Sequence, residues 1–231
     1  MKQIKGGVTA AKGYEAASTA AGIKYQGRTD MALIYSQVPC VSAGTFTTNV
    51  VKAAPVKWDR QIVDSGAGVQ AVVVNSGIAN ACTGEEGMGY CKETAEAAAK
   101  ALNIDAAGVL VGSTGVIGMQ LPMQKLVDGI QVLAGKKAEG LQSGHDAALA
   151  IMTTDTVEKE IGGMSKGSGM IHPNMCTMLA FITTDAAITK EALQKALSED
   201  VEDTYNMISV DGDTSTNDTA ILLANGLAGN Q

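Results

Sequence analysis

Apolar runs alternate with amphipathic stretches over most of this chain. Residues 69–75 (V-Q-A-V-V-V-N) and 108–112 (G-V-L-V-G) are short apolar runs bounded by turn-forming residues, a pattern typical of buried strands. Between them, residues 86–102 place apolar side chains at spacings of three and four, which predicts an amphipathic helix. A strand, a helix and a second strand in this order form the basic unit of an α/β protein.

The remaining segments extend this alternation. Further strands are predicted at residues 31–35, 40–46, 178–182 and 220–224, and further helices at residues 54–63, 121–133, 145–152, 189–197 and 202–209. Pro55 and Pro122 fall in the first turn of two of these helices, where proline is favoured, and Thr189 precedes a third as its cap. No segment recurs at a fixed period, so the predicted fold class is α/β without internal repeats.

Composition narrows the class of protein. The chain has 231 residues, of which 45% are apolar and only 3% aromatic, with 27 glycines, as in a folded α/β protein rather than a disordered one. Its formal net charge is −7 and it has no long basic run, which argues against a nucleic-acid partner. Because the N-terminus has no apolar signal region and no segment is long enough to span a membrane, we expect a cytoplasmic protein.

Cysteine, histidine and glycine spacings do not predict a metal or phosphate site. The four cysteines are Cys40, Cys82, Cys91 and Cys176. They show no C-x-x-C spacing and no histidine at metal-binding spacing, so we expect reduced thiols. His172 precedes Cys176 by four residues, but Pro173 interrupts any helix that would bring the two together. The string G-G-M-S-K-G-S-G lacks the G-K-[ST] order of a phosphate loop and is followed by a strand.

The most informative stretch is residues 166–187, K-G-S-G-M-I-H-P-N-M-C-T-M-L-A-F-I-T-T-D-A-A. A Gly-rich turn at residues 167–173 leads to Thr177, which opens the predicted strand at 178–182. A hydroxyl at the mouth of a buried strand, after a flexible loop, is suited to nucleophilic attack. The same position also suits a β-branched residue that only begins a strand, so the pattern alone leaves both interpretations open.

This string closely resembles the self-cleavage segment of the bifunctional ornithine acetyltransferase (glutamate N-acetyltransferase) family of arginine biosynthesis. Dense matches to the family lie at residues 6–23, 75–84, 112–118 and 162–219. The resemblance implies a two-layer α/β arrangement of the type shared with self-cleaving aminopeptidases. It also implies that residues 1–176 are the N-terminal (alpha) subunit and that residues 177–231 begin a C-terminal (beta) subunit that is truncated here.

The resemblance places the scissile bond between Cys176 and Thr177. Many members have Ala where this chain has Cys176, and we expect this exchange of small residues to be tolerated. In the family, the Thr177 hydroxyl attacks the preceding carbonyl, and hydrolysis of the ester frees the α-amine of Thr177. An α-amine has a pKa of about 8, so it is a usable base beside the hydroxyl that later carries the acetyl group. Cleavage would therefore create the transferase.

Further site residues follow from the same resemblance. It places an oxyanion hole at Thr114 and Gly115, where Gly115 lets a backbone N–H approach closely; without the resemblance, S-T-G is simply a strand-to-helix turn. Lys166, in a Gly-flanked loop, would bind a carboxylate of the amino-acid substrate, and Thr153 would be a second substrate contact. Because the segment at 157–163 is shorter than in relatives, the placement of Thr153 relative to Lys166 stays open.

The predicted reaction moves an acetyl group from N-acetylornithine to glutamate through an acetyl-Thr177 ester. Some family members also take the acetyl group from acetyl-CoA, and the resemblance implies no metal or other cofactor. The implied partners are small amino acids, within a heterotetramer of two alpha and two beta subunits. Two alternatives stay open: a self-cleaving aminopeptidase of related fold, and an inactive truncated remnant. The signatures at residues 75–84 and 211–218 match the family without a role that the residues reveal.

Overall fold

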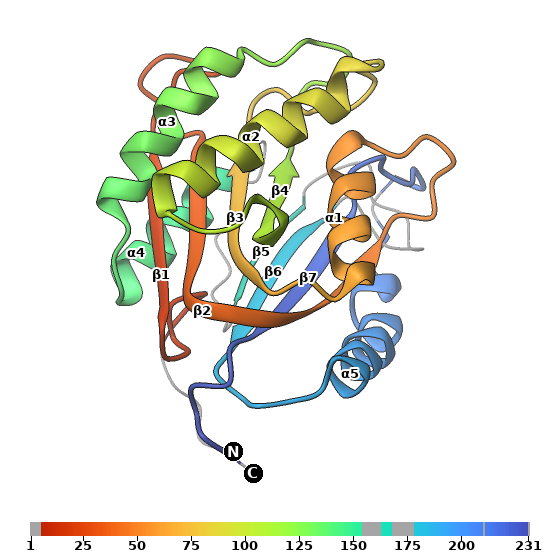
Figure 1. Ribbon diagram of the computed structural model, residues 1–231. Coiled ribbons are helices and arrows are strands. Elements are labelled where there is room, and N and C mark those ends of the chain that lie inside the picture. The colour runs from red at the N-terminus through yellow and green to blue at the C-terminus, as the bar shows by residue number, and fades with distance from the viewer. Residues whose placement is uncertain (1–5, 154–162, 168–177, 210, 231) are drawn as a thin grey trace.

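A single twisted sheet organises the protein in its computed structural model, which describes residues 6–153, 163–167, 178–209 and 211–230 (Figure 1). The strand order is β4-β3-β2-β7-β6-β5, and β1 pairs with β2 beside this path. The strands are β1 (Tyr14–Thr19), β2 (Met31–Phe46), β3 (Val69–Asn75), β4 (Val109–Ser113), β5 (Gly163–Lys166), β6 (Leu179–Thr184) and β7 (Thr219–Ala224). The predictions at Cys176 and Thr177 lie outside the described residues.

Strand β2 joins two halves of the sheet. Two separate strands were predicted at residues 31–35 and 40–46; the structure corrects this to one strand of 16 residues. Its first part pairs with β1 and β3, and its last part, from Val41 onward, pairs with β7. The pairing with β3 is irregular between Tyr35 and Cys40. Pro39 lies in this interval and has no N–H to donate, so the ladder is interrupted while the strand continues.

Two crossover units build the parallel pairs. Strand β3 runs through α2 (Glu86–Leu102) into the parallel strand β4, and β6 runs through α5 (Lys190–Asp203) into the parallel strand β7. The other helices are α1 (Ala54–Ser65), α3 (Met123–Lys136) and α4 (Leu141–Ile151). Thr189 caps α5 as predicted, because its hydroxyl accepts from the N–H of Ala192. No helix within the described ranges combines the length and the apolar character needed to cross a bilayer.

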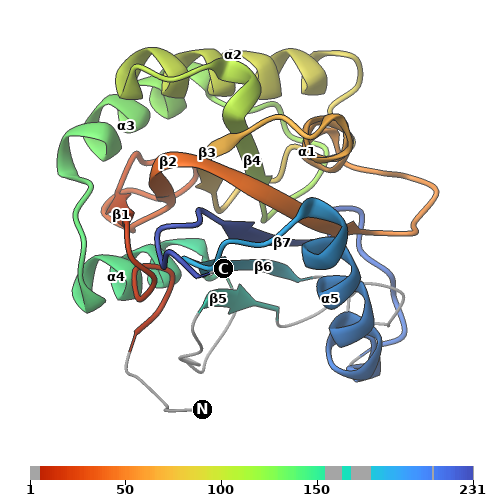
Figure 2. The ribbon, with the colours of Figure 1, turned by 60° about the horizontal axis from the view of Figure 1, so that its bottom comes forward.

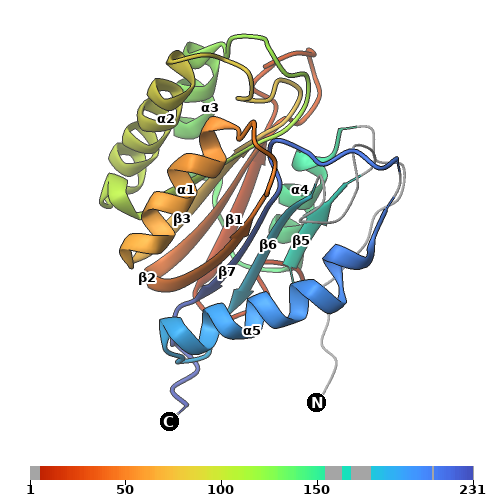
Figure 3. The same ribbon diagram turned by 90° about the vertical axis from the view of Figure 1, so that its right-hand side faces the viewer.

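Each half of the sheet carries its own helices on one face. Helices α2 and α3 cover the half formed by β1 to β4, and α5 covers the last part of β2 together with β6 and β7 (Figures 2 and 3). The other faces of the two halves meet in one core, to which Ile34, Val72 and Leu110 contribute from the first half and Phe181 and Ile221 from the second. The predicted α/β fold class is confirmed, because one mixed sheet packs against helices in both of its halves.

Helix α1 closes the open edge of β4. The Trp58 indole N–H donates to the Val109 carbonyl at 3.0 Å, and Asp59 Oδ1 accepts from the Val111 N–H at 2.8 Å. Edge strands expose unpaired backbone groups, and these two side chains satisfy two such groups on β4. These hydrogen bonds cover part of the β4 edge just before the chain enters the turn that follows Ser113.

Candidate active site

The predicted oxyanion turn follows β4 and is braced by the loop after β3. The Thr114 N–H donates to the Asn75 carbonyl at 3.0 Å, and the Val116 N–H donates to the Gly77 carbonyl at 3.1 Å. Asn80 approaches from the same loop, where its N–H donates to the Ser113 hydroxyl at 2.8 Å. The signature at residues 75–84, to which the sequence assigned no role, therefore supports this turn.

The backbone conformation at residue 115 and the space around it leave room only for glycine. Its φ is +128°, a region that L side chains rarely adopt, and a Cβ built there would lie 2.3 Å from the Gly77 carbonyl carbon. Its N–H donates to no acceptor in the part of the chain that the structure describes. Gly115 is exposed, whereas Thr114 is buried. An N–H without an acceptor at an exposed turn is suited to donate to a substrate oxygen.

Lys166 brings two of the other predicted residues together. It ends strand β5 rather than lying in a loop, and it is only 7% exposed, which corrects the predicted setting. Its Nζ donates to Thr114 Oγ1 at 3.3 Å and to Thr153 Oγ1 at 3.0 Å. A hydroxyl that accepts from a cation keeps its own hydrogen for another partner, so Thr114 Oγ1 can still donate to a developing oxyanion. The sequence left open where Thr153 lies relative to Lys166. In the structure, the two side chains are in direct contact.

Thr153 is positioned by two side chains at the end of α4. The Ser76 hydroxyl donates to the Ala150 carbonyl at 2.7 Å, and Arg28 Nη2 donates to the carbonyls of Met152 and Thr153 at 2.7 and 2.8 Å. The last carbonyls of a helix have no partner inside the helix, so these donors satisfy groups that would otherwise need water. Ser76 belongs to the signature at residues 75–84, to which the sequence assigned no role, and Arg28 lies outside every motif that the sequence analysis named.

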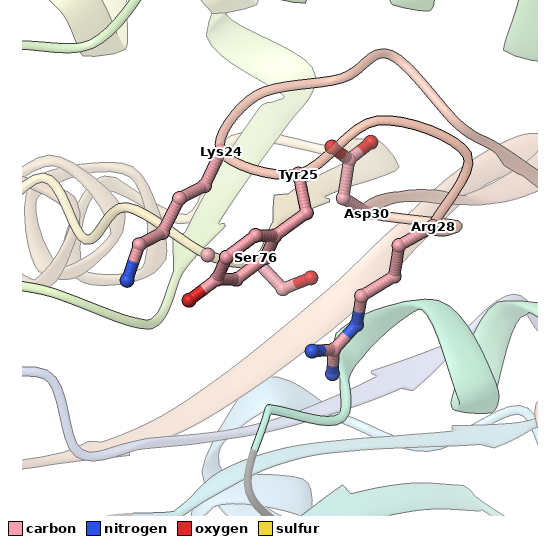
Figure 4. A pocket seen from close by; sticks show the side chains of 6 residues that line it. Lys24, Tyr25, Arg28, Asp30 and Ser76 are labelled. Carbon is pink, nitrogen blue, oxygen red and sulfur yellow. The ribbon is translucent and has the colours of Figure 1, made fainter.

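A shallow pocket lies beside this contact. Its walls are formed by Lys24, Tyr25, Arg28, Asp30, Ser76 and Gly77. Figure 4 shows the Arg28 guanidinium extending toward the end of α4, with the Tyr25 ring and the Ser76 side chain nearby. Gly77 is also the residue that faces Gly115, so the pocket and the oxyanion turn share one wall.

The predicted nucleophile, Thr177, lies outside the described residues, but its neighbours locate the strand that follows it. Lys166 pairs with Leu179 across β5 and β6. Covalent geometry keeps residues two positions apart within about 7 Å of each other between Cα atoms. Lys166 therefore faces the part of β6 nearest to Thr177 in the chain.

Two buried carboxyl groups lie near these elements. Burial raises the pKa of Asp218 to about 8, although hydrogen bonds from Met178 and Ser215 oppose the shift. Burial also raises the pKa of Asp59 well above its usual range, opposed by the hydrogen bond from Val111. Across the described residues, no three side chains of His, Cys, Asp or Glu gather as a metal site would require. The described cysteines, Cys40, Cys82 and Cys91, have free thiols.

Comparison with known proteins identifies the family. The chain matches the ArgJ family over residues 15–231. The chain belongs to the ArgJ family. It is 53% identical to the arginine biosynthesis bifunctional protein ArgJ of Symbiobacterium thermophilum, in a match that covers 100% of this chain and 60% of the relative. It is 55% identical to the protein of the same name from Thermotoga neapolitana, over 88% of this chain and 54% of that protein.

Solved structures of ArgJ proteins share the fold. An ornithine acetyltransferase of Mycobacterium tuberculosis, solved in complex with ornithine, is 44% identical with a TM-score of 0.68; the match covers 73% of this chain and 95% of that chain. The ArgJ protein of Bacillus halodurans is 40% identical with a TM-score of 0.71, over 78% of this chain and 97% of that chain. The present chain thus spans a little over half the length of the two curated ArgJ relatives.

Proposed function

We propose that the protein transfers an acetyl group from N-acetylornithine to glutamate through an ester on Thr177, after the chain cleaves itself between Cys176 and Thr177. The observation that carries this proposal is the contact of buried Lys166 with the hydroxyls of Thr114 and Thr153. Three residues that the sequence resemblance named from separate segments meet at one point. Such a meeting is expected where residues from separate segments build one active site.

Self-cleavage would proceed by acyl transfer within the chain. The Thr177 hydroxyl attacks the Cys176 carbonyl carbon, the bond to the Thr177 nitrogen breaks, and an ester forms on Thr177 Oγ. This step frees the α-amine of Thr177; water then hydrolyses the ester, which gives a carboxylate on Cys176 and restores the Thr177 hydroxyl. Thr114 Oγ1 and the Gly115 N–H are the two donors suited to each tetrahedral oxyanion, because they are adjacent in one braced turn.

Acetyl transfer would use the same groups. The freed amine of Thr177 takes the hydroxyl proton while Thr177 Oγ attacks the acetyl carbonyl of N-acetylornithine, and ornithine leaves with the proton on its nitrogen. The amine of glutamate then attacks the acetyl ester, which regenerates Thr177 and gives N-acetylglutamate. Lys166 suits the role of carboxylate partner for both amino acids, because two hydroxyls hold its ammonium beside the oxyanion turn.

The lengths of the matched relatives support a two-piece product. Three quarters of this chain covers 95% or more of the chain in each solved ArgJ structure, whereas the whole chain covers only 60% of the Symbiobacterium relative. Each crystallised chain is therefore much shorter than the full-length relative. This difference is expected if the full-length protein is cut into an alpha and a beta piece. Two of the curated relatives are named bifunctional, and acetyl-CoA as a second acetyl donor to glutamate is part of this proposal.

The deciding experiment uses the full-length gene product. Denaturing electrophoresis and mass spectrometry should show two pieces with a new N-terminus at Thr177, and Thr177→Ala should remain one piece without transferase activity. Cys176→Ala is the matched control and should cleave and transfer like the wild type. Glutamate-dependent release of ornithine separates the transferase from an aminopeptidase of related fold, which would pass the acyl group to water. An uncleaved protein that transfers acetyl groups fully would contradict the proposal.

A further inference from the structure

Asp218 holds the strand that begins next to Thr177. It is fully buried at the end of the signature at residues 211–218, directly before β7. Its Oδ1 accepts from the Met178 N–H at 3.0 Å, and the next residue, Thr219, donates its N–H to the Met178 carbonyl at 3.0 Å. Two consecutive residues therefore bind both backbone groups of Met178.

The backbone of Asp218 is itself anchored to the centre of the sheet. Its carbonyl accepts from the N–H of Thr47 at 2.9 Å, and the Thr47 hydroxyl donates to the Ser215 carbonyl at 2.7 Å. Thr47 directly follows β2, the strand that joins the two halves of the sheet. The carboxyl group of Asp218 is thus fixed to the most central element of the fold, and through it Met178 is fixed as well.

The peptide that Asp218 binds is the one that links Thr177 to Met178. A displacement of this peptide moves the Cα atom of the proposed nucleophile, and with it the hydroxyl and the amine freed by cleavage. Catalysis depends on reacting atoms lying close to a productive geometry, and a shift of about 1 Å costs on the order of a hundredfold in rate.

Burying the carboxyl group of Asp218 costs free energy, and a strand can begin without a buried acid. Its Oδ2 is buried and has no hydrogen-bond partner among the described residues. Polar groups buried in this way are destabilising, so each one calls for a functional or structural reason. Burial also raises the pKa of this carboxyl group, which opposes a negative charge at this place in the core.

We propose that Asp218 is a positioning residue for Thr177, acting through the hydrogen bond from Met178 N–H to its carboxyl oxygen. The inference rests on the proposed function, because it assigns a role toward the nucleophile of that reaction. It also explains the signature at residues 211–218, since these residues carry Asp218 to the peptide that follows the nucleophile.

The test compares four variants of the full-length protein. Asp218→Ala removes the acceptor, Asp218→Val removes it while filling more of the space, and Asp218→Asn keeps an acceptor oxygen. Asp213→Ala is the matched control, since Asp213 is an exposed acid of the same signature. The readouts are the rate of precursor cleavage, the amplitude of the acetyl-enzyme burst, kcat, KM for N-acetylornithine and the melting temperature.

We expect Asp218→Ala and Asp218→Val to slow cleavage and lower kcat by at least about tenfold, with KM within about twofold of the wild type. Asp218→Asn should recover most of both rates, and Asp213→Ala should match the wild type. If Asp218→Ala does not fold, the Val and Asn variants carry the comparison. A purely structural role would reduce the burst amplitude and leave kcat per active site unchanged, and that result would overturn the inference, as would wild-type rates in the Val variant. Transfer by Thr177→Ala would instead refute the proposed function.

Discussion

At the scale of single residues, Gly115 combines two demands that no other residue meets. The turn needs a positive φ at this position, and the Gly77 backbone lies where a side chain would begin. The glycine is therefore what lets the N–H of residue 115 stand beside the Thr114 hydroxyl as a second donor.

Gly115→Ala should slow self-cleavage and acetyl transfer together, by on the order of a hundredfold, because one pair of donors serves both reactions. The added Cβ would have to displace the Gly77 backbone and so misalign the N–H. Timed electrophoresis of the precursor and steady-state kinetics measure the two rates. Gly118→Ala is the control, because Gly118 also has a positive φ, of +78°, in the same turn, but a Cβ there meets nothing within 4 Å. Loss of only one of the two activities in Gly115→Ala would argue against a shared hole.

Asp59 illustrates a buried acid whose role is in the fold. Its carboxyl group accepts from the Val111 N–H on the edge strand, and its second oxygen is buried without a partner in the described part of the chain. Asp59→Ala should lower the free energy of unfolding by about 1–3 kcal/mol, because the Val111 N–H loses its acceptor. Denaturant unfolding at about pH 5, monitored by circular dichroism, measures this change.

The pH dependence of stability should also change at Asp59. Because burial raises its pKa, the folded protein holds a proton that the unfolded chain releases above the ordinary aspartate pKa of 3.8. The stability contributed by this group is therefore present in acid and is lost as the pH rises toward the folded pKa. Asp59→Asn keeps the acceptor without the proton, so its unfolding free energy should fall less between about pH 5 and pH 8 than that of the wild type. Parallel pH profiles of the two proteins would contradict this assignment.

Lys166 shows where sequence reasoning about single residues fails. A lysine between glycines normally marks a solvated loop, and no local pattern indicates that its ammonium is buried against two hydroxyls. Only the resemblance to a family named Lys166, Thr153, Thr114 and Gly115. The physical reason is that their contacts join β5, the end of α4 and the turn after β4, and such long-range contacts leave no local signature.

At the scale of elements, the end of α4 presents Thr153 to Lys166, and Arg28 fixes that end. Arg28→Ala should raise KM for N-acetylornithine several-fold, roughly 3- to 10-fold, since it releases the carbonyls of Met152 and Thr153. Hydrogen exchange over residues 147–153 should increase in the same variant. Lys24→Ala is the control, because Lys24 lines the same pocket and its Nζ lies 4.9 Å from the Tyr25 ring centroid. An unchanged KM with increased exchange would show that α4 does not contribute to substrate binding.

Elements with strong periodicity were predicted well, and elements made of small residues were not. The predictions for β3 and α2 agree with the structure residue for residue, since long apolar runs and regular helical spacing are local properties. Strands β1 (Y-E-A-A-S-T) and β5 (G-M-S-K) were missed because they carry few large apolar side chains and are held by pairing with distant strands. The predicted helix at 202–209 is instead the end of α5 followed by a short 3-10 helix, Tyr205–Met207.

At the scale of the whole molecule, the proposed cut falls inside a continuous sheet. Strands β6 and β7 belong to the piece that begins at Thr177, while β2 and β5 belong to the piece before it. Strand β7 pairs with β2, and β6 pairs with β5, so the second piece lies between two strands of the first. The same interleaving is visible in Figure 3, where β7, β6 and β5 follow β2 across the sheet.

The two pieces of the cleaved full-length protein should therefore remain together without a covalent link. We expect them to co-elute in size-exclusion chromatography, at the mass of the proposed assembly of two alpha and two beta subunits, and to separate only in denaturant. The uncleaved Thr177→Ala protein is the control and should elute at the same volume. Spontaneous separation of the pieces in native buffer would contradict the strand pairing.

The interleaved sheet also bears on how such a protein can be encoded. If the two pieces were translated separately, the first would expose the unpaired edges of both β2 and β5, and the second would carry β6 and β7 without these two neighbours. Exposed edges of this kind promote association with the wrong chains. A single gene avoids the problem, because tethering keeps β6 and β7 at high local concentration until the sheet has closed around them. The proposed cut between the two pieces is then best made after the sheet has folded.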